Sequence, residues 1–421
     1  MDLRGAPAPV GTLWARRGRS GERAAFQYDD AWLAHPERFA LEPALHLDPS
    51  PQYPPEGRAL FGAFGDSAPD RWGRMLITRA ARREAQRAGH ALPALHELDF
   101  LLGVNDETRS GALRFTALDG GPFLSQGAPA VPPIVDLGPL LEASDRVDGG
   151  DVDDDDALAL LLAPGSSLGG ARPKASVRDR DGSLAIAKFP RVADAYEVER
   201  WEATAIALAG RAGIVAPDVR IEMVADRAVL ITRRFDRRNT QRVPFLSALT
   251  MLGCADGDRR SYPEIADVIR RYGAHARRDL EQLFRRTVFS VLISNTDDHL
   301  RNHGFLYAGP DGWELSPAFD LNPTPTDVRP RVLSTSLTVD DDFTANLDLA
   351  LGEHEHYDLR LDRAKSLAAE IGRAVAEWRS VAQRHGLSRR ACERLATAFE
   401  HEDLAKAQAA TTQHAPCGPP R

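Results

Sequence analysis

The chain has 421 residues, and its 53 lysines and arginines against 61 aspartates and glutamates give a formal net charge of -8. Its length exceeds what one hydrophobic core usually serves, so two or three domains are expected. The acidic balance excludes an overall electrostatic footprint for nucleic acid, although it leaves room for a DNA-binding partner. The three widely separated cysteines favour a reducing compartment over a disulfide framework.

The sequence shows no sign of a membrane anchor. Its N-terminus lacks the apolar stretch of a signal peptide, and no run approaches the ~18 apolar residues that a membrane span needs. We therefore expect a cytoplasmic protein that does not associate with membranes.

The N-terminal part, residues 1–119, predicts a small mixed region. Residues 11–28 place apolar strand-like runs on either side of an Arg-Gly-Arg-Ser-Gly turn, which is typical of a β-hairpin. Pro69 and Asp70 suit the first turn of a helix, because proline tolerates that position and a carboxylate complements the helix dipole. Glycine and proline then dominate the start of a linker that we place over residues 120–150.

Residues 151–245 predict a small sheet that carries a glycine-rich loop. The loop, residues 164–174, contains three glycines and two serines, and strands at 174–178 and 183–189 follow it. Its backbone N–H groups can fold over phosphates, but the loop matches neither the Walker A nor the G-x-G-x-x-G pattern. Taken alone, it is more often a plain turn. The loop residues that we assign to nucleotide binding are Ser167, Gly169, Gly170 and Ala171.

Lys188 interrupts the apolar face of the second of these strands. The local sequence Ala-Ile-Ala-Lys matches the kinase V-A-I-K strand, in which a lysine pairs with nucleotide phosphates and with a glutamate from the next helix. Residues 196–213 have the apolar spacing of such a helix and carry Glu199 and Glu202. We expect one of them, assigned here as Glu202, to pair with Lys188. The plain alternative is a pair of solvated glutamates.

Residues 294–303, Ser-Asn-Thr-Asp-Asp-His-Leu-Arg-Asn-His, follow an amphipathic helix predicted at 279–293. Most of this segment looks too polar for a core. Asp297 and Asn302 have the D-x-x-x-x-N spacing of a kinase catalytic loop, where the carboxylate meets the attacking hydroxyl and the amide oxygen binds magnesium. The neighbouring Asp298 should point away from this site, as a helix cap or an ion-pair partner.

A hairpin predicted at 304–315 leads to Asp320, whose carboxylate can join Asn302 as a hard oxygen ligand for Mg²⁺. The order along the chain is therefore glycine-rich loop, strand lysine, helix glutamate, acidic loop and second aspartate. This is the order of the phosphoryl-transfer template, in which Lys188 clamps phosphates and Asp297 positions the acceptor hydroxyl. Each element alone is weak, but together they predict a phosphotransferase that uses ATP and Mg²⁺.

The C-terminal part, residues 246–405, has few strand signals and predicts a helical lobe. Residues 361–402 read as two helices, the first running through Trp378 and ending at Gly386. Residues 406–421 predict a frayed tail. The expected fold class is α+β, a two-lobed protein-kinase-like fold with an extra N-terminal subdomain, a small sheet lobe and a mainly helical C-terminal lobe.

These motifs resemble those of HipA-family serine/threonine protein kinases, the toxin half of bacterial type II toxin–antitoxin pairs. The resemblance extends over nearly the whole chain. In the N-terminal region it rests on residues 64–74 and 111–115. In the kinase portion it rests on residues 167–174, 187–190, 234–237, 296–302 and 317–320.

The resemblance implies a role for each candidate residue. Lys188 would bind ATP phosphates, Asp297 would be the catalytic base, and Asn302 and Asp320 would hold Mg²⁺. The further nucleotide contacts that it implies are the side chain of His299 and the backbone groups of Arg233 and Phe235. The residues themselves leave His299 open between a structural role and a place near the phosphates. Basic Arg233 departs from the family, whose hinge can be acidic here.

Ser167 stands where family members phosphorylate their own glycine-rich loop, which displaces the loop from the ATP site and silences the kinase. Ser166 is the rival acceptor. Glycines allow such a change with little steric penalty.

The resemblance implies a toxin that phosphorylates a host protein, by family analogy an aminoacyl-tRNA synthetase, and so arrests translation and growth and supports persistence. A small HipB-like helix-turn-helix antitoxin would bind it and connect it to DNA. Two alternatives are a kinase of small molecules or lipids and a catalytically weak kinase-fold scaffold or corepressor. The sequence has no basic amphipathic stretch for a membrane surface, which opposes a lipid kinase. The presence of all four residues Lys188, Asp297, Asn302 and Asp320 opposes a catalytically weak scaffold.

Overall fold

The computed structural model describes residues 1–18, 21–92, 94–117, 121–125, 131–149, 155–162 and 170–409. The chain divides into two compact units. Unit 1 comprises Met1–Asp194 and Glu222–Asp256, and unit 2 comprises Ala195–Ile221 and Gly257–Arg421. The helix expected to supply the glutamate partner of the strand lysine therefore groups with the C-terminal part of the chain.

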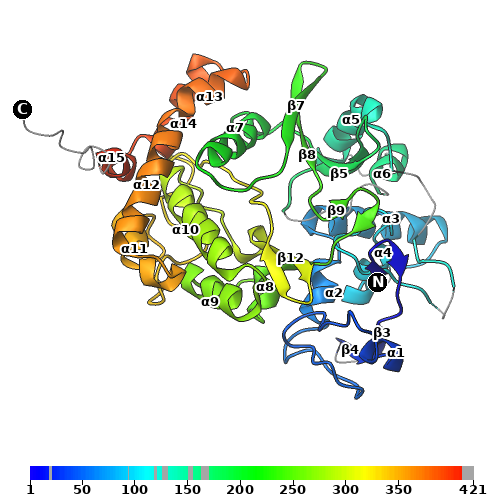
Figure 1. Cartoon of the computed structure of the whole chain (residues 1–421). Coiled ribbons are helices and arrows are strands. Elements are labelled where there is room, and N and C mark those ends of the chain that lie inside the picture. The colour runs from blue at the N-terminus through cyan, green and yellow to red at the C-terminus, as the bar shows by residue number, and fades with distance from the viewer. Residues whose placement is uncertain are drawn as a thin grey trace, which may run out of the picture. The chain divides into compact units, whose positions relative to one another are not determined.

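Unit 1 combines short β-sheets with helices (Figure 1). Its strands are β1 (Asp2–Leu3), β2 (Ala6–Pro7), β3 (Gly11–Gly18), β4 (Gly21–Tyr28), β5 (Lys174–Arg178), β6 (Leu184–Lys188), β8 (Arg227–Arg233), β9 (Arg237–Arg238), β10 (Gln241–Arg242) and β11 (Phe245–Ser247). Its helices are α1 (Asp30–Leu33), α2 (Gly62–Asp66), α3 (Arg71–Arg87), α4 (Glu97–Gly103), η1 (Ile134–Asp136), α5 (Leu137–Asp148), α6 (Asp155–Leu162) and α8 (Ala248–Met251). The predicted hairpin at 11–28 is confirmed as β3 and β4, and both strands after the glycine-rich loop are confirmed as β5 and β6.

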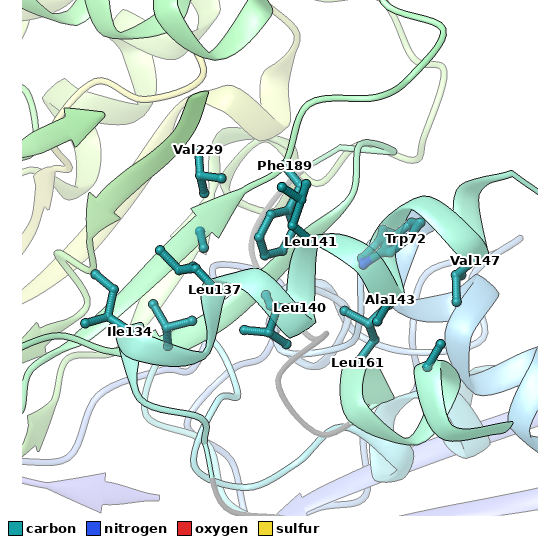
Figure 2. Packing of buried hydrophobic residues seen from close by; sticks show 14 of the residues in the cluster. Trp72, Ile134, Leu137, Leu140, Leu141, Ala143, Val147, Leu161, Phe189 and Val229 are labelled. Atoms are coloured by element: carbon teal, nitrogen blue, oxygen red, sulfur yellow. The ribbon is translucent and has the colours of Figure 1, made fainter. Parts of the chain in front are cut away.

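A four-stranded antiparallel arrangement organises the sheet part of unit 1, with the strand order β5-β6-β8-β7. Strand β7 (Val219–Val224) spans the boundary between the two units. Because cross-strand partners share a face, Ala175, Ala187 and Ile231 lie on one side of the sheet. This side is apolar and belongs to a buried cluster that α5 and α6 complete (Figure 2).

Helix α5 lies within residues 120–150, the range that composition assigns to a linker. Its Leu137, Leu140 and Leu141 have the i, i+3, i+4 spacing that gives a helix an apolar stripe, and all three are buried. Figure 2 shows them in the same cluster as Phe189 of the sheet region. The proline and glycine content of the flanking residues hides this helix from a reading based on composition.

Unit 2 is mainly helical (Figure 1). Its helices are α7 (Val198–Arg211), α9 (Tyr262–Tyr272), α10 (Ala276–Leu292), η2 (Leu300–Asn302), α11 (Leu347–Gly352), η3 (His354–Tyr357), α12 (Leu361–Ala376), α13 (Trp378–Arg384), α14 (Arg389–Phe399) and α15 (Glu402–Ala409). Strands β12 (Gly304–Gly309) and β13 (Gly312–Leu315) form the predicted hairpin. Helix α10 packs against α9, α11 and α12 through buried side chains such as Phe284 and Val288.

Residues 361–402 do not form the two helices that the sequence predicts. The first stretch breaks at Glu377 into α12 and α13, and α14 follows. Trp378 begins the new helix and stacks on Phe399 with ring centroids 4.6 Å apart, so a tertiary contact lies at the break. Gly386 follows α13 with a φ of +84°, as expected of a helix terminator. Residues 406–409, the start of the expected tail, belong to α15, and residues 410–421 lie outside the described residues.

None of the helices within the described ranges is long and apolar enough to cross a membrane.

Candidate active site

The sheet of unit 1 has one polar face, opposite the apolar cluster. Lys188 is the cross-strand partner of Lys174, and Ser176, Ile186 and Thr232 follow side by side on three neighbouring strands. The hydroxyl oxygens of Ser176 and Thr232 are buried and have no hydrogen-bond partner within the described residues. Buried hydroxyls are normally paired, so this face suits a polar ligand. The predicted strand lysine therefore lies on a face fit for phosphates.

Lys174, which sequence reasoning did not single out, joins the N-terminal subdomain to this sheet. Its Nζ lies 2.7 Å from the buried Asp70 Oδ2, and its carbonyl accepts a hydrogen bond from Trp72 Nε1 at 3.0 Å. Asp70 also accepts from Gly73 N and so caps α3, as its position in the sequence predicts. A Cβ at Gly170, where φ is +95°, would lie 3.3 Å from Lys174 Nζ. The end of the glycine-rich loop thus lies close to Lys174, which pairs with Asp70, the residue that caps α3.

Three of the loop residues that the sequence assigns to nucleotide binding or autophosphorylation, Ser166, Ser167 and Gly169, lie outside the described residues. Gly170 and Ala171 are described, and Ala171 accepts a hydrogen bond from the Arg191 side chain through its carbonyl. Their contacts with a nucleotide stay a prediction.

The expected hinge separates an exposed residue from a buried ion pair. Arg233 ends β8 with an exposed side chain 3.5 Å from Asp181. The next arginine, Arg234, is buried and donates from Nε and Nη2 to Asp236 at 2.8 and 2.5 Å. Burial opposes ionisation of Asp236, yet Arg234 and Arg237 lower the pKa of its carboxyl well below its usual range. The backbone contact of Arg233 and Phe235 with adenine stays a prediction.

The same buried pair binds the N-terminal subdomain. Arg234 Nη1 donates to the Thr108 carbonyl at 2.6 Å, Arg237 Nη2 donates to the Arg109 carbonyl at 2.6 Å, and Gly111 N donates to Asp236 Oδ2 at 2.9 Å. Residues 108–111 and 234–237 therefore form one cluster, which we call the Asp236 cluster. Its role is structural, and the buried charges in the sequence Arg-Phe-Asp-Arg were its only signal.

Helix α7 of unit 2 carries the predicted glutamates. Glu199 and Glu202 are both buried, which excludes the alternative of solvated glutamates. Lys188 belongs to unit 1 and Glu202 to unit 2. Their ion pair stays a prediction.

The 294–303 loop follows α10, and the expectation that it is too polar for a core is wrong. Its buried residues are Ser294, Asn295, Thr296, Asp298, Leu300, Asn302 and His303. Buried polar groups are tolerated when they are hydrogen-bonded, and neighbouring segments of unit 2 supply the partners. Ser294, for example, donates from Oγ to the Ala398 carbonyl at 2.9 Å and accepts from Arg331 Nε at 3.0 Å.

Asp298 is buried, whereas Asp297 is exposed, so the two side chains point to different surroundings, as predicted. Its Oδ2 accepts from Tyr262 OH at 2.5 Å and from Ser290 Oγ at 2.9 Å, and its Oδ1 lies 3.2 Å from His303 Nε2. Burial opposes the charge, but His303, Tyr262 and Ser290 together lower the pKa of Asp298. Burial and the facing carboxylate raise the pKa of Tyr262 well above its usual value. These buried contacts connect the loop to α9 and α10 and stabilise its conformation.

Asp297 differs from its neighbour because its side chain is 65% exposed. Its Oδ1 lies 3.0 Å from Arg329 Nη1, and its carbonyl accepts from Asn302 Nδ2 at 3.1 Å. That bond occupies the amide nitrogen of Asn302 and leaves its Oδ1, which is buried and has no partner within the described residues. His299 Nδ1 is likewise buried and without a described partner. The loop therefore combines an accessible carboxylate with buried side-chain atoms that have no hydrogen-bond partner among the described residues, and Asn302 Oδ1 and His299 Nδ1 are the two that belong to predicted site residues.

The chain brings the segment of Asp320 back to this loop. In the β12–β13 hairpin, Ser316 N donates to the Gly304 carbonyl at 2.8 Å, so the chain returns to its starting point beside Asn302. Beyond Asp320, Asn322 N donates to Asn295 Oδ1 at 3.3 Å. Asp320 itself has a left-handed backbone with a φ of +59°, a conformation that is costly for most residues and is concentrated at functional sites.

The donor set fits Mg²⁺ rather than a transition metal. Across the described ranges, no group of three or more His, Cys, Asp or Glu side chains could hold a metal ion. The expected ligands are one amide and one carboxylate, and Mg²⁺ commonly takes only one or two protein oxygens together with phosphates and water. The unsatisfied Oδ1 of Asn302 meets this requirement. Asn322 Oδ1, also buried without a described partner, was not anticipated from the sequence.

Two family models match the chain. The HipA N-terminal domain model matches residues 4–115, and the HipA-like C-terminal domain model matches residues 166–402. The chain belongs to the HipA family. The C-terminal match contains every residue assigned above to the site, from Ser167 to Asp320. A comparison with curated proteins gives no match.

A solved HipA structure has the same fold as this chain. HipA of the Shewanella oneidensis MR-1 toxin–antitoxin system, solved with HipB and operator DNA, matches with a TM-score of 0.60 and 16% identity over 96% of this chain and 95% of that chain. This likeness confirms the expected α+β kinase-like fold. The Helicobacter pylori proinflammatory kinase CtkA matches with a TM-score of 0.47 and 15% identity over 60% of this chain and 96% of that chain.

Proposed function

We propose that this HipA-family chain is an ATP- and Mg²⁺-dependent protein kinase that phosphorylates serine or threonine on a host protein and acts as a growth-arresting toxin. The observation that carries the proposal is the 294–303 loop. It presents one exposed carboxylate, Asp297, on a frame of buried hydrogen bonds, beside the Asn302 amide oxygen, which has no partner in the part of the chain that the structure describes. Frames of this kind preorganise catalytic groups.

In the proposed reaction, Asp297 takes the proton of the acceptor hydroxyl. The acceptor oxygen forms a bond to the γ-phosphorus while the bond from that phosphorus to the bridging oxygen breaks, and ADP leaves. Mg²⁺, when bound, neutralises charge on the phosphates. Asn302 and Asp320 are the residues proposed to hold it, and Lys188 is proposed to bind the phosphates from the polar sheet face.

Family membership supports the finer parts of the proposal. An aminoacyl-tRNA synthetase is the substrate that family analogy indicates. Ser167 is the proposed autophosphorylation site, with Ser166 as its rival. The Shewanella HipA was solved with HipB and operator DNA. We propose by analogy that a HipB-like helix-turn-helix antitoxin binds this chain and that DNA is reached only through it.

The proposal is tested by incubating the purified, partner-free and dephosphorylated chain with γ-labelled ATP, Mg²⁺ and a cell extract. We expect label on the chain itself and on at least one extract protein, and we expect EDTA and Asp297→Asn to abolish both. Labelling of a lipid or a small molecule in place of protein would favour another class of kinase. If no acceptor is labelled, the chain is not a kinase.

The loop serine is tested separately by mapping the labelled residue. Ser167→Ala should abolish autophosphorylation and leave the extract substrate labelled. Persistence of the autophosphorylation signal in this variant would move the acceptor to Ser166 or elsewhere.

A further inference from the structure

The segment that follows Asp320 is fastened to the 294–303 loop along its length. Thr324 N donates to the Ser294 carbonyl at 3.2 Å. Ser334 Oγ donates to the Thr296 carbonyl at 2.9 Å, and further along Thr335 Oγ1 donates to the Asp298 carbonyl at 2.6 Å. Hydrogen bonds at both ends of residues 324–335 therefore join this segment to the loop that carries the proposed base.

The middle of this segment is an exposed turn. Both Val328 N and Arg329 N donate to the Pro325 carbonyl, at 3.0 and 3.1 Å. Asp327 is neutralised by Arg394, whose Nη1 lies 2.8 Å from it. The turn is therefore held in shape from its own side, and its acidic residue already has a cation.

Arg329 is the residue of this turn that contacts the proposed base, Asp297. Its Nη1 lies 3.0 Å from Asp297 Oδ1, and its side chain is 50% exposed. Such an exposed ion pair contributes only about 0–1 kcal/mol to stability, so breaking it should affect the fold little. The guanidinium has five N–H donors in a planar fork and can hold a second carboxylate while one donor stays on Asp297.

We propose that Arg329 selects the acceptor, and that the preferred substrate of this chain carries an Asp or Glu side chain close to the phosphorylated serine or threonine. The inference rests on the proposed kinase function. A general base works only within hydrogen-bond distance of the acceptor hydroxyl, so the substrate chain must pass beside the remaining donors of Arg329. An acidic side chain finds a partner there, and a basic one meets a like charge.

A different role for Arg329 is stabilisation of charge on the transferring phosphoryl group, as arginine fingers do. The two roles differ in what they predict. A phosphoryl contact acts on every acceptor alike, whereas acceptor selection acts only on substrates with an acidic neighbour.

The inference is tested with a set of serine peptides in which Glu, Gln or Lys is placed at each position around the acceptor. The chain and its Arg329→Ala and Arg329→Glu variants are compared by kcat/KM for each peptide. Arg360→Ala is the matched control, because Arg360 is also an exposed arginine with an aspartate partner, Asp362, at 3.0 Å. Circular dichroism verifies that all variants are folded.

We expect Glu at one or two positions to raise kcat/KM of the parent chain over Gln by roughly 10- to 100-fold, the size of a charged hydrogen bond. Arg329→Ala should bring the ratio of kcat/KM for Glu peptides to that for Gln peptides down to about one, and Arg329→Glu should favour Lys. Arg360→Ala should behave as the parent.

Two results overturn the inference alone: phosphorylation without any preference for Glu, or an equal loss for all peptides in Arg329→Ala. Absence of transfer from ATP to peptides, to extract proteins and to the chain itself overturns the proposed kinase function, and the inference falls with it.

Discussion

The Asp236 cluster of unit 1 and the 294–303 loop of unit 2 both bury charged side chains, and both contain a buried polar atom without a described partner, such as Arg109 Nε in the cluster. They differ in the pairing of the residues at their centres. Both oxygens of Asp236 and all three guanidinium nitrogens of Arg234 have partners. In the loop, Asn302 Oδ1 and His299 Nδ1 are buried without a described partner. A buried polar atom without a partner is costly, and at the proposed site a bound metal ion or nucleotide would supply the missing interaction.

The largest effect should come from Asp297→Asn. Loss of a general base lowers the rate by about 10²- to 10⁴-fold. Because the side chain is exposed, the free energy of unfolding should stay within about 0.5 kcal/mol of the parent. Phosphate transfer from labelled ATP and chemical denaturation measure the two quantities. A rate that survives the substitution would remove Asp297 from the role of base.

In the Asp236 cluster, a substitution should lower the free energy of unfolding strongly, unlike Asp297→Asn. Asp236→Ala leaves two buried guanidinium groups without their counter-charge, and we expect the free energy of unfolding to fall by about 3–5 kcal/mol. Arg233→Ala, a neighbouring substitution at an exposed side chain, is the control and should change it by less than about 0.5 kcal/mol. Equal losses in the two variants would mean that the buried pairing contributes no special stability.

The buried hydrogen bonds of Asp298, next to the proposed base, can be tested by the pH dependence of the unfolding free energy. Its pKa is lowered in the folded chain, so its contribution to stability is present above its unfolded pKa of about 3.9 and is lost as the pH falls through the lower folded value. Asp298→Asn removes this titration. Its unfolding free energy should therefore depend less on pH below about pH 4 than that of the parent. Parallel acid dependences would contradict a paired Asp298.

The sequence predicts the elements well where local signals are strong. Alternation of apolar and polar residues predicts β5 and β6, and the helical spacing of apolar residues predicts α10. The acidic Asp70 indicates the start of α3. Helix α5 is missed because prolines and glycines around it suggest a linker. The break at Glu377 is missed because spacing does not reveal the tertiary contact that lies there, the stacking of Trp378 on Phe399.

The site is predicted in part for the same reason. The D-x-x-x-x-N spacing identifies Asp297 and Asn302, and it separates Asp297 from Asp298. Burial of most of the 294–303 loop is not visible in its composition, because the partners that satisfy it come from distant segments. Arg329 also escapes sequence reasoning, since nothing local relates it to a residue 32 positions away.

The proposal that Asn302 Oδ1 helps to hold Mg²⁺ is tested most directly by a binding titration. Mg²⁺ is titrated into the chain in the presence of a non-hydrolysable ATP analogue, and the titration is repeated with Asn302→Ala. We expect Mg²⁺-dependent nucleotide binding by the parent. In the variant we expect a loss of roughly tenfold or more in Mg²⁺ affinity, with the free energy of unfolding changed far less than by Asp236→Ala. Equal Mg²⁺ affinity in the two proteins would show that Asn302 does not hold the metal ion.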